Sequence, residues 1–314
     1  MTLDPTSLHG VIPPVCTPMT PDRTFDEASF RRLLEHQIEA GIHGAFILGS
    51  TSETPLLTSD VQDAVIAAAV DQIRGRVPVI VGCIEFATNR VIERAQRASE
   101  LGADAIVVCP PFYITPSNQE MVRHYDTVRS TVDLPILAYD VPGATHVKLP
   151  RPVIHELATS GAIIGLKDSS GQDANFRGVI LDNQDNPDFR IFTGSELTAD
   201  IAIYMGAHGI VPGLGNVDPA GYVRMYDAAG SGDWETARAE QDRLYRLFEI
   251  IQVPDGSDYG RSAAAHGAFK VALHERGWID HPHTALPHTL LTGDHHQAIR
   301  GIMRKAGLLT LSRA

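Results

Sequence analysis

The sequence contains only three cysteines, Cys16, Cys83 and Cys109, and no two of them have CxxC spacing. An odd number of widely separated cysteines argues against a disulfide framework and against a zinc site. We therefore expect three buried thiols in a protein that works in a reducing compartment.

Long hydrophobic runs and an excess of basic charge are missing as well. No apolar stretch approaches the roughly 18 residues needed to span a bilayer, and the first residues lack the basic and apolar segments of a secretion signal. The net charge of −12 argues against a nucleic-acid partner and against a polybasic membrane surface. We expect a cytoplasmic protein with neither a nucleic-acid nor a membrane partner.

Lysine is scarce, since only four of the 26 basic residues are lysines. Among them, Lys167 ends the apolar run at residues 163–166 and precedes a polar loop. An ammonium group is rarely buried without a reason, and the carboxyl ends of strands carry the active sites of α/β folds. Lys167 is therefore a candidate nucleophile for Schiff-base chemistry.

Eight short apolar runs alternate with helical patterns such as those at residues 26–41, 58–75 and 88–102. The runs are apolar throughout, as expected for parallel strands buried on both faces. Eight βα repeats predict an α/β fold, a (β/α)8 TIM barrel, rather than an open sheet. The predicted strands are residues 11–16, 45–48, 77–81, 105–109, 136–139, 163–167, 190–192 and 209–211.

Strand signals stop near residue 219, and the rest of the chain predicts helices. These segments contain too little apolar sequence for an independent core. We therefore predict a TIM-barrel catalytic domain over residues 1–220 and a C-terminal helical extension over 221–314 that packs on it. The four helices are expected at residues 222–229, 234–251, 262–276 and 295–306.

Polar residues at two predicted strand ends suggest partners for Lys167. Gly49 precedes the hydroxyl residues Ser50 and Thr51, and this combination of exposed N–H groups and hydroxyls suits a carboxylate. The alternative is a helix start at which Glu53 closes a capping box with Ser50. Tyr139 ends another strand and is either a proton shuttle or an aromatic core residue.

Several short motifs follow one another along nearly the whole chain. They are Val-Cys-Thr-Pro at residues 15–18, Gly-Ser-Thr-Ser-Glu at 49–53, Tyr-Asp-Val-Pro at 139–142, Gly-Leu-Lys-Asp-Ser-Ser-Gly at 165–171 and Ala-Gly-Leu-Leu at 306–309. In these motifs the chain resembles the pyruvate-dependent Schiff-base family that contains dihydrodipicolinate synthase and N-acetylneuraminate lyase. The resemblance implies a barrel enzyme that needs no cofactor and no metal, because the imine itself withdraws electrons.

The resemblance also implies roles for individual residues. Lys167 would form the imine with pyruvate or another 2-oxo acid, and Tyr139 would transfer protons beside it. Ser50 and Thr51, after Gly49, would bind the carboxylate of the 2-oxo acid.

Further roles implied by the resemblance involve the assembly and the strand ends. Tyr113 matches a tyrosine that is contributed across a subunit interface and completes a proton relay with Tyr139 and Ser50. The carbonyl group of Val211 would lie near the imine. Members of the family are commonly homotetramers, built as dimers of dimers.

The chain departs from the family pattern where the second substrate would bind. Dihydrodipicolinate synthases have a carboxylate-binding arginine at the position of Ala144, and His146 follows nearby. Losing a bidentate carboxylate partner is not a conservative change. Ser195 and Glu196 stand where the lyase branch has an Asp-Glu pair that binds hydroxyl groups.

The leading hypothesis is a class I lyase that forms or cleaves a C–C bond through a Lys167 imine. Its expected substrate is a 2-oxo-3-deoxy sugar acid or a related 4-hydroxy-2-oxo acid. The alternatives are dihydrodipicolinate synthase itself, a dehydratase of keto-deoxy sugar acids that uses the same lysine, and a non-catalytic barrel paralogue.

Five histidines crowd the C-terminal region without a regular ligand spacing, and prolines interrupt them. We expect a solvated loop rather than a metal site. They are His281, His283, His288, His295 and His296.

Overall fold

An eight-stranded parallel sheet forms the centre of the computed structural model, which describes residues 3–309. Each strand pairs with its sequence neighbour from β2 to β8, and β1 pairs with β8. This order is that of a (β/α)8 barrel, so the predicted fold is confirmed. The strands are β1 (Gly10–Val11), β2 (Ala45–Ile47), β3 (Val79–Gly82), β4 (Ala105–Val108), β5 (Ile136–Asp140), β6 (Gly165–Asp168), β7 (Arg190–Thr193) and β8 (Gly209–Ile210).

The barrel closes where the segment after β1 meets β2. The Phe46 N–H donates to the Pro13 carbonyl (3.0 Å), and the Val15 N–H donates to the Phe46 carbonyl (2.9 Å). The regular strand β1 is shorter than the predicted one and ends at Val11. Two prolines at positions 13 and 14 have no N–H to donate, so the segment cannot continue a regular ladder.

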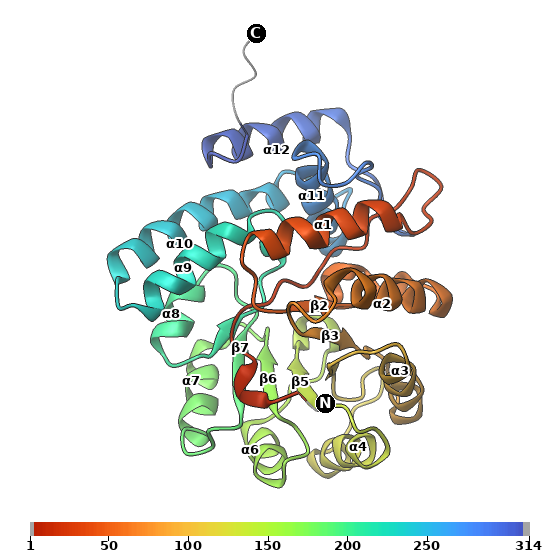
Figure 1. Ribbon diagram of the computed structural model, residues 1–314, viewed down its shortest axis with the longest axis vertical. Coiled ribbons are helices and arrows are strands. Elements are labelled where there is room, and N and C mark those ends of the chain that lie inside the picture. Colours follow the sequence, from red (N-terminus) through yellow and green to blue (C-terminus); the bar gives the residue numbers. More distant parts are fainter. Residues whose placement is uncertain (1–2, 310–314) are drawn as a thin grey trace.

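Helices cover the outside of the barrel and connect its strands (Figure 1). Helices α1, α2 and α3 begin within one residue of their predicted starts, whereas α9 begins three residues before its predicted start. Asp26 caps α1 by accepting a hydrogen bond from the Ser29 N–H (3.1 Å). The α-helices are α1 (Glu27–Glu39), α2 (Ser59–Ile73), α3 (Thr88–Glu100), α4 (Asn118–Thr131), α5 (Pro142–Thr145), α6 (Arg151–Ser160), α7 (Asp173–Asp182), α8 (Ala199–Tyr204) and α9 (Pro219–Gly230). Short 3-10 turns are η1 (Pro5–Ser7), η2 (Ser50–Ser52), η3 (Thr54–Leu56), η4 (Gly213–Asn216) and η5 (Glu249–Gln252).

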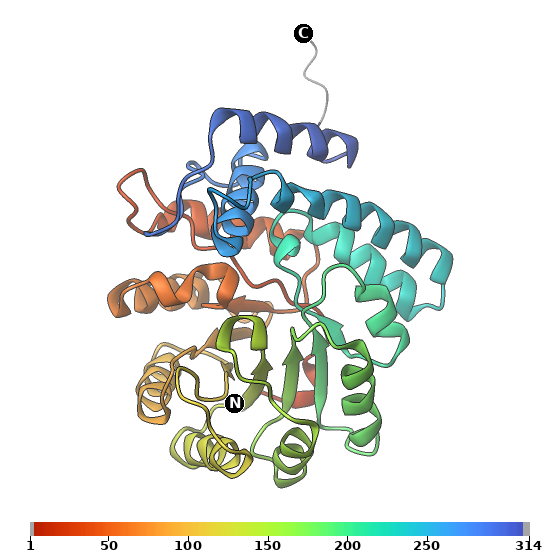
Figure 2. The same cartoon turned by 180° about the vertical axis from the view of Figure 1, so that it is seen from behind.

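Three further helices follow the barrel: α10 (Trp234–Phe248), α11 (Arg261–Glu275) and α12 (Gly293–Lys305). Helix α10 packs along α9, and α11 contacts both α12 and η5 (Figures 1 and 2). Arg32 of α1 donates to the Trp278 carbonyl (3.0 Å) and pairs with Asp280 (2.7 Å). The helical extension therefore packs on the barrel, whereas the division of the chain at residue 220 stays a prediction.

Side chains alternate between the interior of the barrel and the layer beneath the helices. On β5, Leu137 and Tyr139 belong to the interior cluster with Phe46 and Phe192, whereas Ala138 packs in the outer layer. This two-layer packing is what a small closed barrel requires. Strand ends that carry inward-facing side chains can therefore present them at the mouth of the barrel.

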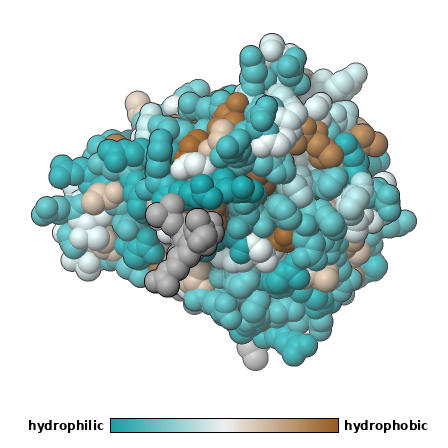
Figure 3. All heavy atoms as spheres, turned by 90° about the horizontal axis from the view of Figure 1, so that it is seen from above, coloured by the Kyte–Doolittle hydropathy of each residue, from teal (hydrophilic) through white to brown (hydrophobic). Residues whose placement is uncertain are grey.

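The three cysteines are buried and unpaired, as predicted. Burial raises the pKa of each thiol to about 12, so these groups stay protonated at neutral pH. Within residues 3–309, no helix combines the length and apolar character that crossing a bilayer requires. Hydrophilic residues cover most of the face that carries α12, with small apolar groups between them (Figure 3).

Candidate active site

Two adjacent strands place Lys167 and Tyr139 side by side. The residues are paired in the register of β6 and β5, and both are buried, with 5% and 3% of their surface exposed. The Lys167 Nζ lies 4.1 Å from the centre of the Tyr139 ring and 4.8 Å from that of Phe46. The amine therefore rests between two aromatic rings inside the barrel.

The loop after β2 brings hydroxyl groups to the same place. The Ser50 Oγ lies 3.5 Å from the Tyr139 hydroxyl. The first hydrogen bond of η2 runs from the Ser52 N–H to the Gly49 carbonyl (3.1 Å). The Ser50 and Thr51 N–H groups come before it, and neither N–H has a hydrogen-bond acceptor in the described chain. Unpaired donors at the start of a turn are suited to bind an anion.

Gly49 is required by the packing at this point. A β-carbon on Gly49 would lie 2.7 Å from the Phe46 ring, which itself contacts Lys167. Any side chain here would displace that ring. The glycine before the two hydroxyl residues thus maintains the wall of the lysine site.

The loops at this end of the barrel contain strained backbone. Five non-glycine residues in these loops have positive φ angles: Arg23 (62°), Leu48 (59°), Glu53 (61°), Tyr113 (73°) and His146 (57°). They follow β1, β2, β4 and β5, at the carboxyl ends of the strands. Such conformations cost about 1–3 kcal/mol each and cluster at functional sites.

Glu196 is a partly buried carboxyl at the same end, in the loop after β7. Its Oε1 accepts a hydrogen bond from the Leu214 N–H. A β-carbon on Gly213 would lie 3.2 Å from the Glu196 Oε1 and 3.3 Å from the Thr51 Oγ1, so these two side chains converge. Burial raises the pKa of Glu196 to about 7, although Leu214, Lys167 and Gly213 lower it.

The raised pKa of Glu196 makes the stability of the protein depend on pH. The unfolded chain releases this proton near pH 4.5 and the folded chain near pH 7, so the free energy of unfolding should fall as the pH rises between these values. The loss is at most about 3 kcal/mol, because one pKa unit corresponds to about 1.4 kcal/mol. In Glu196→Gln this pH-dependent part of the free energy of unfolding should disappear.

Chemical denaturation of the wild type and of Glu196→Gln at pH 4.5 and pH 8 measures how the free energy of unfolding of each protein depends on pH. Glu156→Gln, on an exposed position of α6, is the matched control and should keep the pH dependence of the wild type. An unchanged pH dependence in Glu196→Gln would contradict the assignment.

The other predicted site residues form no hydrogen bond with Lys167 in the described part of the chain. Val211 is buried, and its N–H donates to the Thr193 carbonyl (2.8 Å). The Ser195 hydroxyl lies 2.9 Å from that of Thr198. Ala144 and His146 are exposed at the end of α5.

Tyr113 is 96% exposed in the single chain. Its side chain therefore does not reach the Tyr139 and Ser50 hydroxyls within this chain. The expected relay stays a prediction about an assembly of chains.

The capping-box alternative for the β2 loop is wrong. Ser52, and not Glu53, caps the loop, because its Oγ accepts from the Gly49 N–H (3.1 Å). Glu53 instead turns away and forms a fully buried ion pair with Lys270 of α11. Lys270 was not predicted as a functional residue, although it also lies within an apolar run and has the same sequence signal as Lys167.

The predicted solvated histidine loop is also wrong in part. His295 and His296 lie on α12, and the His288 Nδ1 lies 3.3 Å from the Glu53 Oε2. Glu53, His266 and His288 bring potential metal-binding atoms within 4.8 Å of one another. The ammonium group of Lys270 already neutralises Glu53, so this cluster forms an ion-pair network and suits a divalent cation poorly.

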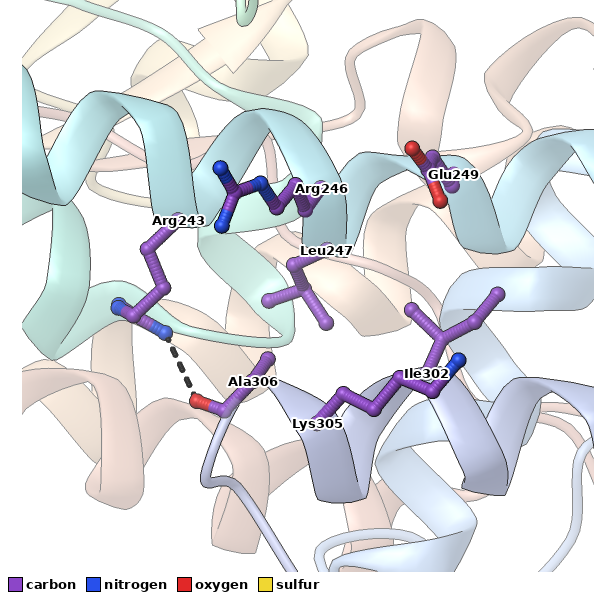
Figure 4. Close-up of a pocket in the computed structure, with 7 residues that line it drawn as sticks. All are labelled: Arg243, Arg246, Leu247, Glu249, Ile302, Lys305 and Ala306. Carbon is purple, nitrogen blue, oxygen red and sulfur yellow. Dashed lines mark hydrogen bonds between the residues drawn. The ribbon is translucent and has the colours of Figure 1, made fainter.

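A cavity of about 410 Å³ lies between α10 and α12, away from the strand ends. Arg243 donates to the Ala306 carbonyl (3.3 Å) across it, while Arg246 and Lys305 extend along its edges (Figure 4). Its side chains come from the extension alone, so the barrel mouth remains the candidate active site. Fold and site together define a TIM-barrel enzyme with a buried lysine at its centre.

Comparison with known proteins agrees with this class. Residues 7–306 match the Dihydrodipicolinate synthetase family. The chain therefore belongs to the dihydrodipicolinate synthetase family and is a lyase of that family.

Individual relatives cover most of the chain. A 4-hydroxy-tetrahydrodipicolinate synthase of Nitrosomonas eutropha is 32% identical over 94% of this chain and 97% of its own length. An uncharacterized DapA-like lyase of Halobacterium salinarum is 35% identical over 79% and 81%. Among solved structures, the prophage protein YagE of E. coli K12, in complex with pyruvate, has a TM-score of 0.89 and 28% identity over 96% and 99% of the two chains.

Proposed function

We propose that this protein is a pyruvate-dependent class I lyase that forms or cleaves a C–C bond through an imine on Lys167. The observation that carries the proposal is the contact between the buried Lys167 amine and Tyr139, whose hydroxyl lies 3.5 Å from Ser50. A nucleophile beside a proton-transfer group is the arrangement that covalent catalysis requires. The pyruvate complex of YagE supports the choice of ligand.

The chemistry begins with the unprotonated Lys167 amine. It attacks the carbonyl carbon of the 2-oxo acid, a C–N bond forms, and the carbonyl oxygen leaves as water after proton transfer through Tyr139. The iminium then accepts the electron pair of a bond at the next carbon. Loss of a proton there gives an enamine that adds to an aldehyde, and the reverse sequence cleaves the C–C bond.

The hydroxyl loop fixes the substrate for this attack. The Ser50 and Thr51 N–H groups and hydroxyls would bind the carboxylate of the 2-oxo acid, at the side of the site where Ser50 meets Tyr139. The Val211 carbonyl would lie near the imine. Holding the reacting carbonyl close to the amine lowers the activation free energy by several kcal/mol.

The acceptor side favours a hydroxylated substrate over aspartate semialdehyde. Ala144 offers no cation for a second carboxylate, whereas Glu196 and Ser195 present oxygen atoms that bind hydroxyl groups. A 2-oxo-3-deoxy sugar acid or a 4-hydroxy-2-oxo acid fits these groups. Dihydrodipicolinate synthase is the second candidate, because relatives over nearly the whole chain have that name; a dehydratase would use the same imine.

The assembly belongs to the same proposal. A homotetramer made of two dimers would cover Tyr113, which is almost fully exposed in the single chain. Within such a dimer, Tyr113 would complete the relay with Tyr139 and Ser50 of the neighbouring site. A cytoplasmic location agrees with the three unpaired thiols.

Borohydride reduction in the presence of pyruvate tests the function directly. Peptide mass analysis should find a reduced pyruvate adduct on Lys167 and on no other lysine. Assays of pyruvate release from a panel of 4-hydroxy-2-oxo acids then identify the substrate class. An unmodified Lys167 peptide would contradict the imine mechanism and leave a non-catalytic barrel.

A further inference from the structure

Lys270 and Glu53 form an ion pair that is completely removed from solvent. The side chains of both residues are 0% exposed. Lys270 also donates to the His283 carbonyl (2.8 Å). Burial raises the pKa of Glu53, but Lys270 and His288 outweigh it and lower this pKa to about 2.

The pair connects the β2 loop with two separate parts of the C-terminal extension. Lys270 comes from α11, and Glu53 Oε2 accepts from the Ala285 N–H (2.7 Å) in the segment before α12. His288 lies 3.3 Å from the same oxygen atom. Glu53 is thus held from three directions by residues more than 200 positions later in the chain.

Glu53 is also part of the loop that carries Ser50 and Thr51. Its N–H donates to the Ser50 carbonyl (3.0 Å), and its φ of 61° lets the chain turn sharply after Ser52. On the other side, Ser52 Oγ donates to the Val15 carbonyl (2.5 Å). The two hydroxyl residues are therefore followed directly by two anchors, Ser52 on the barrel and Glu53 on the extension.

A stability argument alone does not explain this pair. Removing two charges from water costs several kcal/mol for each ion, and apolar residues of similar size often stabilise a core equally well or better. A buried charge pair does fix geometry, since its oxygen and nitrogen atoms must keep their partners. The pair lies beside the loop that carries Ser50 and Thr51, so the geometry that it fixes is the geometry of this loop.

We propose that Lys270 is a positioning residue, which acts through Glu53 to hold Ser50 and Thr51 in the geometry that binds the substrate carboxylate. The inference rests on the proposed function and assigns a catalytic purpose to the helical extension. It predicts that loss of the pair weakens recognition of the carboxylate and leaves the reactivity of Lys167 intact.

Trapping with two ketones separates these effects. Pyruvate and acetone both form an imine that borohydride reduces, but only pyruvate carries a carboxylate. In the double variant Lys270→Met, Glu53→Gln, which leaves no unpaired buried charge, the ratio of pyruvate to acetone trapping on Lys167 should fall about tenfold or more. Glu53→Gln alone should shift this ratio in the same direction.

The matched control is Arg300→Met, Glu275→Gln, which removes an ion pair (2.7 Å) between α12 and α11 within the same extension. Its trapping ratio should equal that of the wild type. An unchanged ratio in the Lys270 variant, or an equal loss with both ketones, would overturn the positioning role. Absence of trapping in the wild type would instead overturn the proposed function.

Hydrogen exchange of the wild-type protein provides a test that needs no variant. Pyruvate should slow exchange of the Ala285 amide, because this N–H is bonded to Glu53. The Arg276 amide, which donates to the Ala272 carbonyl in the last turn of α11 (3.1 Å), should be unaffected. Equal exchange at Ala285 with and without pyruvate would contradict the proposed link.

Discussion

Lys167→Met should abolish both the borohydride-trapped pyruvate adduct and turnover of the substrate. Methionine has a similar length and can keep the contacts with the Phe46 and Tyr139 rings, but it has no amine to form a C–N bond. The expected loss of kcat is about 10³-fold or more, because the covalent route is removed as a whole. Peptide mass analysis and steady-state kinetics measure the two effects.

Lys167→Arg is the matched control that separates loss of the positive charge from loss of the nucleophile. The guanidinium group keeps a cation between the two rings but cannot act as the imine-forming nucleophile. Both variants should therefore be inactive while remaining folded. Turnover within tenfold of the wild type in either variant would show that Lys167 is not the nucleophile.

Tyr139→Phe should lower kcat by about 10² to 10³-fold, within the usual range for loss of a proton-transfer group. The aromatic ring that contacts the Lys167 Nζ at 4.1 Å remains, so KM should change little, whereas imine formation should slow because its loss of water uses the Tyr139 hydroxyl. Single-turnover trapping and steady-state kinetics together separate imine formation from turnover.

Tyr125→Phe is the control for loss of a buried tyrosine hydroxyl. Tyr125 is fully buried on α4 in the layer outside the barrel interior, and its hydroxyl donates to the Val108 carbonyl (3.0 Å). This variant should lose about 1 kcal/mol of stability and keep its kcat. An unchanged kcat in Tyr139→Phe would remove the tyrosine from the proton-transfer pathway.

The local sequence predicts Lys167, Tyr139 and Ser50 well, because each lies in a short motif at the end of an apolar strand. Neighbouring parallel strands then bring these residues together, as the pairing of Tyr139 with Lys167 shows. The β2 loop was harder to predict. Its pattern permits a capping box, and only contacts with the distant residues Lys270, Ala285 and His288 direct Glu53 elsewhere.

Phe46 and Glu196 show the limit of local patterns. Phe46 is an ordinary apolar strand residue in the sequence, and it becomes part of the site only because the barrel closes and turns its ring toward Lys167. From the sequence, Glu196 is expected only as the counterpart of one residue in a hydroxyl-binding pair. The raised pKa of this carboxyl depends on how deeply the folded chain buries it.

The sequence by itself determined the alternation of strands and helices, the barrel that follows from it and the position of Lys167 at a strand end. These features depend on apolar periodicity and on short-range motifs, which a linear pattern contains. Only the tertiary structure decided that Lys270 and Glu53 meet, and that the C-terminal extension holds the hydroxyl loop. Such contacts join residues more than 200 positions apart, and their formation depends on the packing of the whole chain rather than on any local pattern.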